Sequence, residues 1–267
     1  MADCNHNCGS CGVEGCGERQ EIKKLVPHKG TSFKKIIAII SGKGGVGKSL
    51  VTSLVATALT NDGKKVAILD ADITGPSIPQ AFGLKDAYAT QDENGIYPAV
   101  TSKGIKVMSI NLLLERNEDP IIWRGPILSG FVQQLFTDVN YGELDYLLID
   151  MPPGTGDVPL TVFQSLPIDG VIVVSSPQEL VSMVVQKSVN MARMMYVPIY
   201  GLVMNMAYVK CPYCNERIEV FKHAEDHYEI PLLAELPIDP NIARLVDEGK
   251  IEEYSTEDFK EVLKAIE

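Results

Sequence analysis

A glycine-rich loop that follows the first apolar segment restricts this chain to few architectures. Gly42-Lys-Gly-Gly-Val-Gly-Lys-Ser49 matches the pattern G-x-x-x-x-G-K-S/T, with the apolar run IIAII (36–40) before it and a helical segment (48–61) after it. In a strand–loop–helix unit of this kind, glycines let backbone N–H groups turn toward phosphate oxygens, and the helix dipole favours negative charge. The motif predicts a nucleotide-binding loop made of Gly42, Lys43, Gly44, Gly45, Val46, Gly47, Lys48 and Ser49.

The remainder of the chain from residue 34 alternates apolar runs of strand length with helical segments. Runs rich in Val, Ile and Leu without alternation are typical of parallel strands that are covered on both faces. The pattern predicts one α/β domain over 34–267 with a doubly wound, mostly parallel sheet. The expected strands are 36–40, 66–69, 107–110, 146–149, 171–174, 200–204 and 232–236, and the expected helices are 48–61, 126–138, 178–195, 240–248 and 256–266.

Charge and hydropathy exclude several classes of protein. The formal net charge is −11, which disfavours a nucleic-acid binder, because such binding depends on Lys and Arg that neutralise phosphates. No run of about eighteen apolar residues is present, and no apolar signal core is found near residue 1, so we expect a cytoplasmic chain without a membrane partner.

Two acidic loops follow predicted strands. VAILDAD (66–72) ends with Asp70 and Asp72, and YLLIDMPPGTGD (146–157) contains Asp150. The carboxyl ends of parallel strands are where such sheets bind ligands. Lys48 is expected to reach the β- and γ-phosphates, and the Ser49 hydroxyl to ligate Mg²⁺. A carboxylate after an apolar strand can hold a water molecule bound to that Mg²⁺, although a single Asp there is equally common as a cap.

The second lysine of the loop, Lys43, makes the motif resemble the deviant Walker A class, which includes the nitrogenase iron protein, MinD and ParA. The resemblance implies that Lys43 crosses a dimer interface to the partner's nucleotide, as an arginine finger does. It also implies that Asp72 positions the attacking water and that Asp150 is the Walker B carboxylate. In that class an Asn after the sixth strand and a segment near the last strand flank adenine, and Asn205, Pro237 and Asp239 match them. We therefore expect ATP.

Six cysteines in a cytosolic chain indicate metal ligands before disulfides. Cys211-x₂-Cys214 supplies two thiolates, whereas a zinc ion or a 4Fe–4S cluster takes four, so two chains related by a twofold axis could complete the set. A zinc site within one chain, with His223 and His227, is the alternative. Cys4, Cys8, Cys11 and Cys16 lie in a tail (1–33) without apolar periodicity, a candidate second cluster or zinc site.

Six motifs in order resemble the Mrp/nucleotide-binding-protein-35 family of cytosolic iron–sulfur carriers. They are SGKGGVGKS, DADITGPS, WRGP, LDYLLIDMPPGTGD, NMA and CPYC. The resemblance implies a homodimer with a 4Fe–4S cluster bridged by Cys211 and Cys214 of both subunits. It also implies slow ATP hydrolysis coupled to loading from a cluster donor or delivery to apo-proteins. The alternatives are a spatial organiser of the MinD or ParA kind and a zinc-stabilised ATPase without a cluster.

Overall fold

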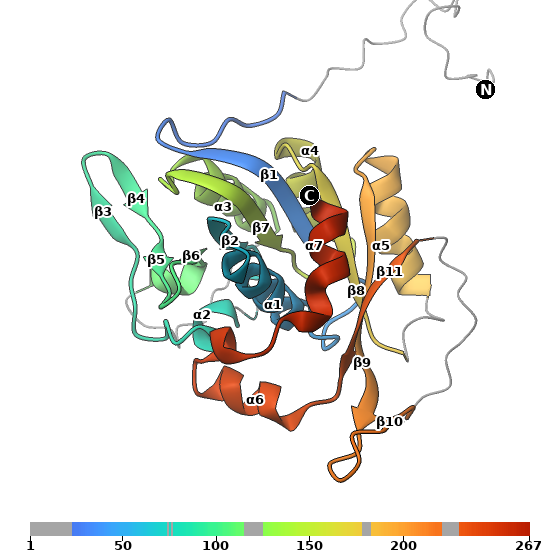
Figure 1. Cartoon of the computed structure of the whole chain (residues 1–267). Coiled ribbons are helices and arrows are strands. Elements are labelled where there is room, and N and C mark those ends of the chain that lie inside the picture. The colour runs from blue at the N-terminus through green and yellow to red at the C-terminus, as the bar shows by residue number, and fades with distance from the viewer. Residues whose placement is uncertain (1–22, 74, 76, 115–124, 178–182, 221–229) are drawn as a thin grey trace, which may run out of the picture.

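A computed structural model describes residues 23–73, 75, 77–114, 125–177, 183–220 and 230–267 (Figure 1). Within these ranges the chain forms a nine-stranded sheet with the order β10-β9-β8-β1-β7-β2-β6-β5, in which β11 also pairs with β9. The pairs along the body of the sheet are parallel, whereas β5 and β10 run antiparallel to their neighbours. A separate two-stranded hairpin is made by β3 and β4. The predicted doubly wound, mostly parallel α/β fold is confirmed.

The strands of the large sheet are β1 (Ser32–Ser41), β2 (Val66–Asp70), β5 (Ala99–Val100), β6 (Lys106–Met108), β7 (Glu143–Asp150), β8 (Gly170–Ser175), β9 (Ile199–Lys210), β10 (Arg217–Ile218) and β11 (Leu232–Pro237). The hairpin consists of β3 (Thr90–Asp92) and β4 (Gly95–Tyr97). The α-helices are α1 (Lys48–Asn61), α2 (Ile78–Ala81), α3 (Gly125–Thr137), α4 (Asp157–Ser165), α5 (Met183–Met194), α6 (Pro240–Asp247) and α7 (Lys260–Ile266). Short 3₁₀ turns are η1 (Ile110–Leu112), η2 (Ile251–Glu253) and η3 (Glu257–Phe259).

Helices cover both faces of the sheet and create two apolar cores. In β1, Ile36, Ala38 and Ile40 contribute to the core that contains side chains of α3, α4 and α5. Ile37 and Ile39 contribute to the other core, which contains side chains of α1, α2, α6 and α7. Successive side chains of a strand point to opposite faces, so burial on both sides requires the unbroken apolar runs seen in the sequence. Figure 1 shows α1 and α7 in front of the sheet and α3, α4 and α5 behind it.

Most expected elements occur where the sequence placed them, although the short elements α2, β3, β4, β5 and β10 were not predicted. Longer elements also differ. Helix α4 (Asp157–Ser165) was not predicted; its Pro159 lies in the first turn, where the missing N–H costs no intrahelical bond. The sixth expected strand, 200–204, extends to Lys210, so Asn205 lies inside β9 and not after it. The last helix begins as η3 and continues as α7, and residues 178–182 of another expected helix lie outside the described ranges.

The expected boundary at residue 34 lies inside β1. Residues before that strand also bond to the body: the Lys24 ammonium donates to the carbonyl of Phe163 (2.6 Å), and the Leu25 N–H donates to that of Ser165 (2.7 Å). Both carbonyls belong to the last turn of α4, where helix carbonyls need outside donors. The described helices include none that is long and apolar enough to cross a membrane.

Candidate functional site

The glycine-rich loop joins β1 to α1 and borders a cavity of about 320 Å³. Gly45 (φ +86°) and Gly47 (φ +82°) have left-handed backbone conformations, which residues with a Cβ rarely adopt. The cavity is lined by Ser41, Lys43, Gly44, Gly45, Val46, Gly47, Lys48, Ser49, Leu50, Asp72, Gly75, Ser77, Ala81, Pro153 and Val246. It therefore combines the loop backbone with side chains that follow β2 and β7 and with one residue of α6.

Asn205 of β9 leaves no room for a side chain at Gly47. The buried Asn205 side chain of β9 donates from Nδ2 to the carbonyl of Val46 (2.9 Å), which ties β9 to the loop. A Cβ on Gly47 would lie 2.2 Å from that nitrogen, closer than any real contact, so a larger residue would push the amide away.

We expect Gly47→Ala to weaken ATP binding by at least about tenfold more than Gly45→Ala does, roughly 1.4 kcal/mol. Both variants force a Cβ into a left-handed conformation, but the added atom at Gly45 meets nothing within 4 Å. The difference therefore measures the displaced Asn205 amide. Titration with a fluorescent ATP analogue would measure it, and equal losses in the two variants would contradict the contact.

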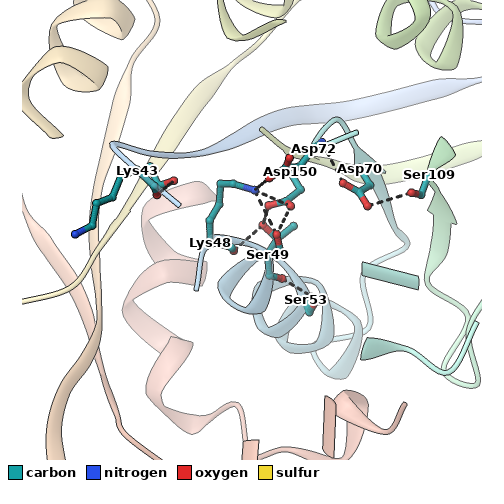
Figure 2. Close-up of polar contacts among 10 residues, drawn as sticks. Lys43, Lys48, Ser49, Ser53, Asp70, Asp72, Ser109 and Asp150 are labelled. Carbon is teal, nitrogen blue, oxygen red and sulfur yellow. Dashed lines mark hydrogen bonds and ion pairs between the residues drawn. The ribbon is translucent and has the colours of Figure 1, made fainter. Parts of the chain in front are cut away.

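Beneath the loop, a buried cation meets a buried carboxylate (Figure 2). The Lys48 ammonium donates to Asp150 Oδ2 (2.8 Å) and lies 3.6 Å from Asp72 Oδ2. The Ser49 hydroxyl donates to the same Asp150 oxygen (2.5 Å), and the Thr52 hydroxyl donates to Oδ1 (2.7 Å). Asp150 is completely buried, so this net of donors stabilises its charge.

Asp70 lies beside Asp150 because β2 and β7 pair in a register that puts the two residues opposite each other. Burial raises the pKa of Asp70 well above its ordinary value, and the Asp150 carboxylate adds to the shift, whereas Lys48 opposes it. Asp70 accepts hydrogen bonds from the hydroxyl of Ser109 (3.1 Å) and from the backbone N–H of Asp72 (3.1 Å). It therefore holds the backbone of the loop that carries Asp72.

Lys43 points elsewhere. Figure 2 shows its side chain extending away from the cluster of Lys48, Asp72 and Asp150, and the residue is exposed. The two lysines of one loop are thus separated: one is directed into the site of its own chain and the other outward.

Of the residues proposed to flank the base, Asn205 lies inside β9, Pro237 ends β11 and Asp239 directly precedes α6. Pro237 pairs with Tyr208 of β9. Asp239 caps α6, because its Oδ1 accepts from the Asn241 N–H (2.8 Å), and its Oδ2 accepts from the Tyr254 hydroxyl (3.2 Å). Asp239 thus stabilises the start of α6 and binds the Tyr254 hydroxyl, in addition to any contact with a base.

Cys211 directly follows β9, and the turn from Cys211 to Glu216 leads into β10. The thiols of Cys211 and Cys214 are free, the first partly exposed and the second exposed. The backbone N–H of Tyr213, then that of Cys214, bonds to the Cys211 sulfur, and these bonds lower the pKa of its thiol. The turn therefore places two thiols beyond the end of β9, and hydrogen bonds lower the pKa of the Cys211 thiol.

Several expected ligands lie outside the described residues: Cys4, Cys8, Cys11, Cys16, His223 and His227. Within the described ranges, no group of three His, Cys, Asp or Glu side chains is arranged to hold a metal ion.

The donor set suits a magnesium nucleotide. The hydroxyl of Ser49 and a carboxylate oxygen of Asp150 are adjacent, and hard oxygen ligands of this kind are those that Mg²⁺ takes beside phosphates. Left-handed glycines keep the loop free of side chains on the phosphate side. The buried ammonium of Lys48 would supply the positive charge that transferring phosphates need.

Three contributors were not identified from the sequence. Thr52 could have been, because it lies one helical turn after Lys48 and shares its face. Ser109 depends on β6 lying next to β2, and the bond from the Gly154 N–H to the Ser41 carbonyl (2.9 Å) depends on the path of the loop after β7. Neither neighbour relation can be read from a single sequence.

Comparisons with known proteins agree with this geometry. A family model described as NUBPL iron-transfer P-loop NTPase, of the ParA group, matches residues 32–267. An iron-sulfur cluster carrier protein of Clostridium perfringens is 47% identical over 262 residues, covering 94% of this chain and 92% of that protein. One from Methanocaldococcus jannaschii is 42% identical over 283 residues, covering 100% and 97%.

A solved structure of a nucleotide-binding protein from Archaeoglobus fulgidus, in complex with ADP and containing cobalt, is also similar. It has a TM-score of 0.76 and 44% identity and covers 85% of this chain and 90% of its own. The resemblance drawn from the six motifs is confirmed, and the chain belongs to the family of NUBPL-type iron-transfer P-loop NTPases.

Proposed function

We propose that this protein is an ATP-dependent iron–sulfur cluster carrier: two copies hold a 4Fe–4S cluster between them and transfer it to apo-proteins. The observation that carries the proposal is the position of Cys211 and Cys214. They form an exposed turn at the end of β9, the same strand whose Asn205 bonds to the nucleotide loop. Relatives that carry the name iron-sulfur cluster carrier protein, at 40–47% identity, support it.

The cluster is the cargo, and its ligands would come from both protomers. A 4Fe–4S cluster takes four thiolates, and each chain offers two at this turn. The surroundings favour a second copy: the side chain of Tyr213 is 96% exposed, and those of Ile218 and Val220 are half exposed. A twofold axis through the turns would bring both thiol pairs together and cover these apolar side chains.

ATP would be bound by Gly42 to Ser49, with Lys48 on the β- and γ-phosphates and with Asn205, Pro237 and Asp239 near the base. Bound Mg²⁺, held by Ser49 and by Asp150 through water, would neutralise charge on the transferring phosphate. Asp72, 3.6 Å from the Lys48 ammonium, would orient the attacking water. Lys43, directed outward, would complete the site of the partner protomer. Hydrolysis would be slow and coupled to cluster loading from a donor or to release.

The test is anaerobic reconstitution of the full-length protein with iron and sulfide. The wild type is expected to form a brown dimer with about four iron and four sulfide per dimer at the bridge. The double variant Cys211→Ala/Cys214→Ala should lose that cluster and the dimer that depends on it. A matched variant with Ala at Cys4, Cys8, Cys11 and Cys16 should keep the bridge and lose only any cluster that the tail binds.

Two results would contradict the proposal. One is a double variant with the iron and sulfide content of the wild type. The other is a purified monomer with one tightly held zinc per chain and no sulfide, which would indicate a zinc-stabilised ATPase. An organiser of the MinD or ParA kind would instead sediment with anionic vesicles or bind DNA in the presence of ATP.

A further inference from the structure

The hairpin that carries the two thiols has little support of its own. Strand β10 consists of Arg217 and Ile218, which pair with Lys210 and Val209 of β9. Two-residue ladders are marginal without packing on a larger body. The orientation of the cysteine turn must therefore depend on contacts between the hairpin and the rest of the domain.

Arg217 makes such contacts in two directions. Its guanidinium donates from Nη1 and Nη2 to the two carboxylate oxygens of Glu235 on β11, at 2.7 and 3.0 Å. Its Cζ also lies 4.3 Å from the centre of the Tyr208 ring on β9. Only a planar group with parallel N–H donors can bond to both oxygens of a carboxylate and stack on an aromatic ring at the same time. The lysine ammonium is neither planar nor able to offer parallel donors. The Arg217 and Glu235 side chains are 40% and 25% exposed, so the pair adds little stability and serves chiefly to fix geometry.

The partners of Arg217 continue toward the nucleotide cavity. The carbonyl of Tyr208 accepts the Ile238 N–H (2.7 Å), and the next residue, Asp239, caps α6. Val246 of α6 lines the cavity. Along the other route, Asn205, three residues before Tyr208 on β9, holds the Val46 carbonyl of the nucleotide loop. In Figure 1 the β9–β10 hairpin extends from the edge of the sheet where α6 lies.

We propose that Arg217 is a positioning residue that couples the thiol pair to the nucleotide cavity. This inference rests on the proposed function, because it concerns how ATP alters the presentation of Cys211 and Cys214. Displacements of the nucleotide loop or of α6 reach Tyr208 and Glu235 through β9 and β11. The contacts of Arg217 with Glu235 and with the Tyr208 ring make the hairpin move together with β9 and β11. Without these contacts, the cysteine turn is held only by the two-residue pairing of β10 with β9 and changes its orientation independently.

The experiment measures the reactivity of the thiols in the full-length, cluster-free protein under anaerobic conditions. The rate of alkylation by iodoacetamide at Cys211 and Cys214 is followed by peptide mass spectrometry, with and without Mg²⁺-ATPγS. In the wild type we expect the nucleotide to change the rate by about fivefold or more, the lower range of coupling between linked sites. In Arg217→Met and Arg217→Lys the change should fall below about twofold, with ATPγS affinity retained.

Lys264→Met is the matched control, because it removes another exposed ion pair, with Glu261 on α7, far along the chain from the hairpin. It should behave as the wild type. Glu235→Gln keeps the size of the partner and removes its charge, so it should reproduce part of the loss. A nucleotide effect in Arg217→Met equal to that of the wild type would overturn the inference.

The outcome is distinguishable from failure of the carrier function. The alkylation assay uses protein without a cluster, so its result does not depend on whether a cluster can be reconstituted. Failure to form a cluster in the reconstitution experiment would count against the carrier proposal alone. A wild-type protein whose thiols react equally with and without nucleotide would overturn the coupling itself, even if a cluster binds.

Discussion

Replacing Lys43 with Ala is expected to slow ATP hydrolysis by about 10³-fold or more, the usual effect of losing a finger residue, with little change in ATP affinity. The Lys43 side chain extends away from the cluster of Lys48, Asp72 and Asp150, in which Lys48 is the buried cation. We therefore expect its ammonium to stabilise the transition state in the site of a second protomer. Steady-state phosphate release and a separate ATP titration would measure the two effects.

Mixing two inactive variants tests whether Lys43 acts across the dimer. In Lys43→Ala the site keeps its own Asp72, and in Asp72→Ala the chain can still lend Lys43 to its partner. Random mixing should restore about one quarter of the wild-type rate, because half of the dimers are mixed and each has one complete site. Asp72→Ala is the suitable second variant for the mixture, because Lys48→Ala would also remove the hydrogen bond from Lys48 to Asp150. No recovery on mixing would place Lys43 in its own site or outside the reaction.

The nucleotide loop could be predicted almost completely because its signal is local. Its glycines, lysine and serine are consecutive, and the strand and helix that frame it are continuous in sequence. The separation of Lys43 from Lys48 follows from two left-handed glycines between them, Gly45 and Gly47, which turn the backbone at these points.

What depends on strand neighbours could not be predicted. Asp70 and Asp150 were each expected at the end of a strand, but only the β2–β7 register places them opposite each other. The same is true of Ser109, which reaches Asp70 because β6 lies beside β2. A single sequence specifies the faces of strands through their periodicity but not their order in the sheet.

The length of β9 illustrates a second limit. The apolar run stops near Met204, so the expected strand ended there, yet the ladder continues to Lys210. The extension is paired by β11 as far as Tyr208 and then by β10, two partners that lie later in the chain. This tertiary pairing overrides the local pattern, and it is what carries the thiols beyond the edge of the nucleotide site.

Replacing Lys48 with Met is expected to remove nucleotide binding and also to destabilise the fold, by about 3–5 kcal/mol, because a buried carboxylate loses its partner charge. The Lys48 ammonium lies 2.8 Å from Asp150, which is completely buried, and it is central to a group that also includes Asp70 and Asp72. The hydroxyls of Ser49 and Thr52 would remain as donors to Asp150 but carry no positive charge.

The loss of unfolding free energy in Lys48→Met should depend on pH, because it comes from buried carboxylates that titrate. The pKa of Asp70 is already raised by burial and by Asp150, and Lys48 opposes the shift, so removing Lys48 raises it further. A carboxyl group with a higher pKa in the folded state binds more protons when folded, so stability falls as pH rises from the ordinary value of 3.8 toward the raised one. The deficit of Lys48→Met relative to the wild type should therefore be largest at neutral pH and shrink in acid.

Urea denaturation at several pH values between neutrality and mild acid would measure this difference. Lys43→Met is the control, since it removes an exposed lysine from the same loop and should leave the free energy of unfolding within about 0.5 kcal/mol of the wild type. If Lys48→Met were as stable as the control at neutral pH, or if its deficit grew in acid, Lys48 would not be what offsets the negative charge of the buried carboxylates. The buried ammonium would then be needed for phosphate alone.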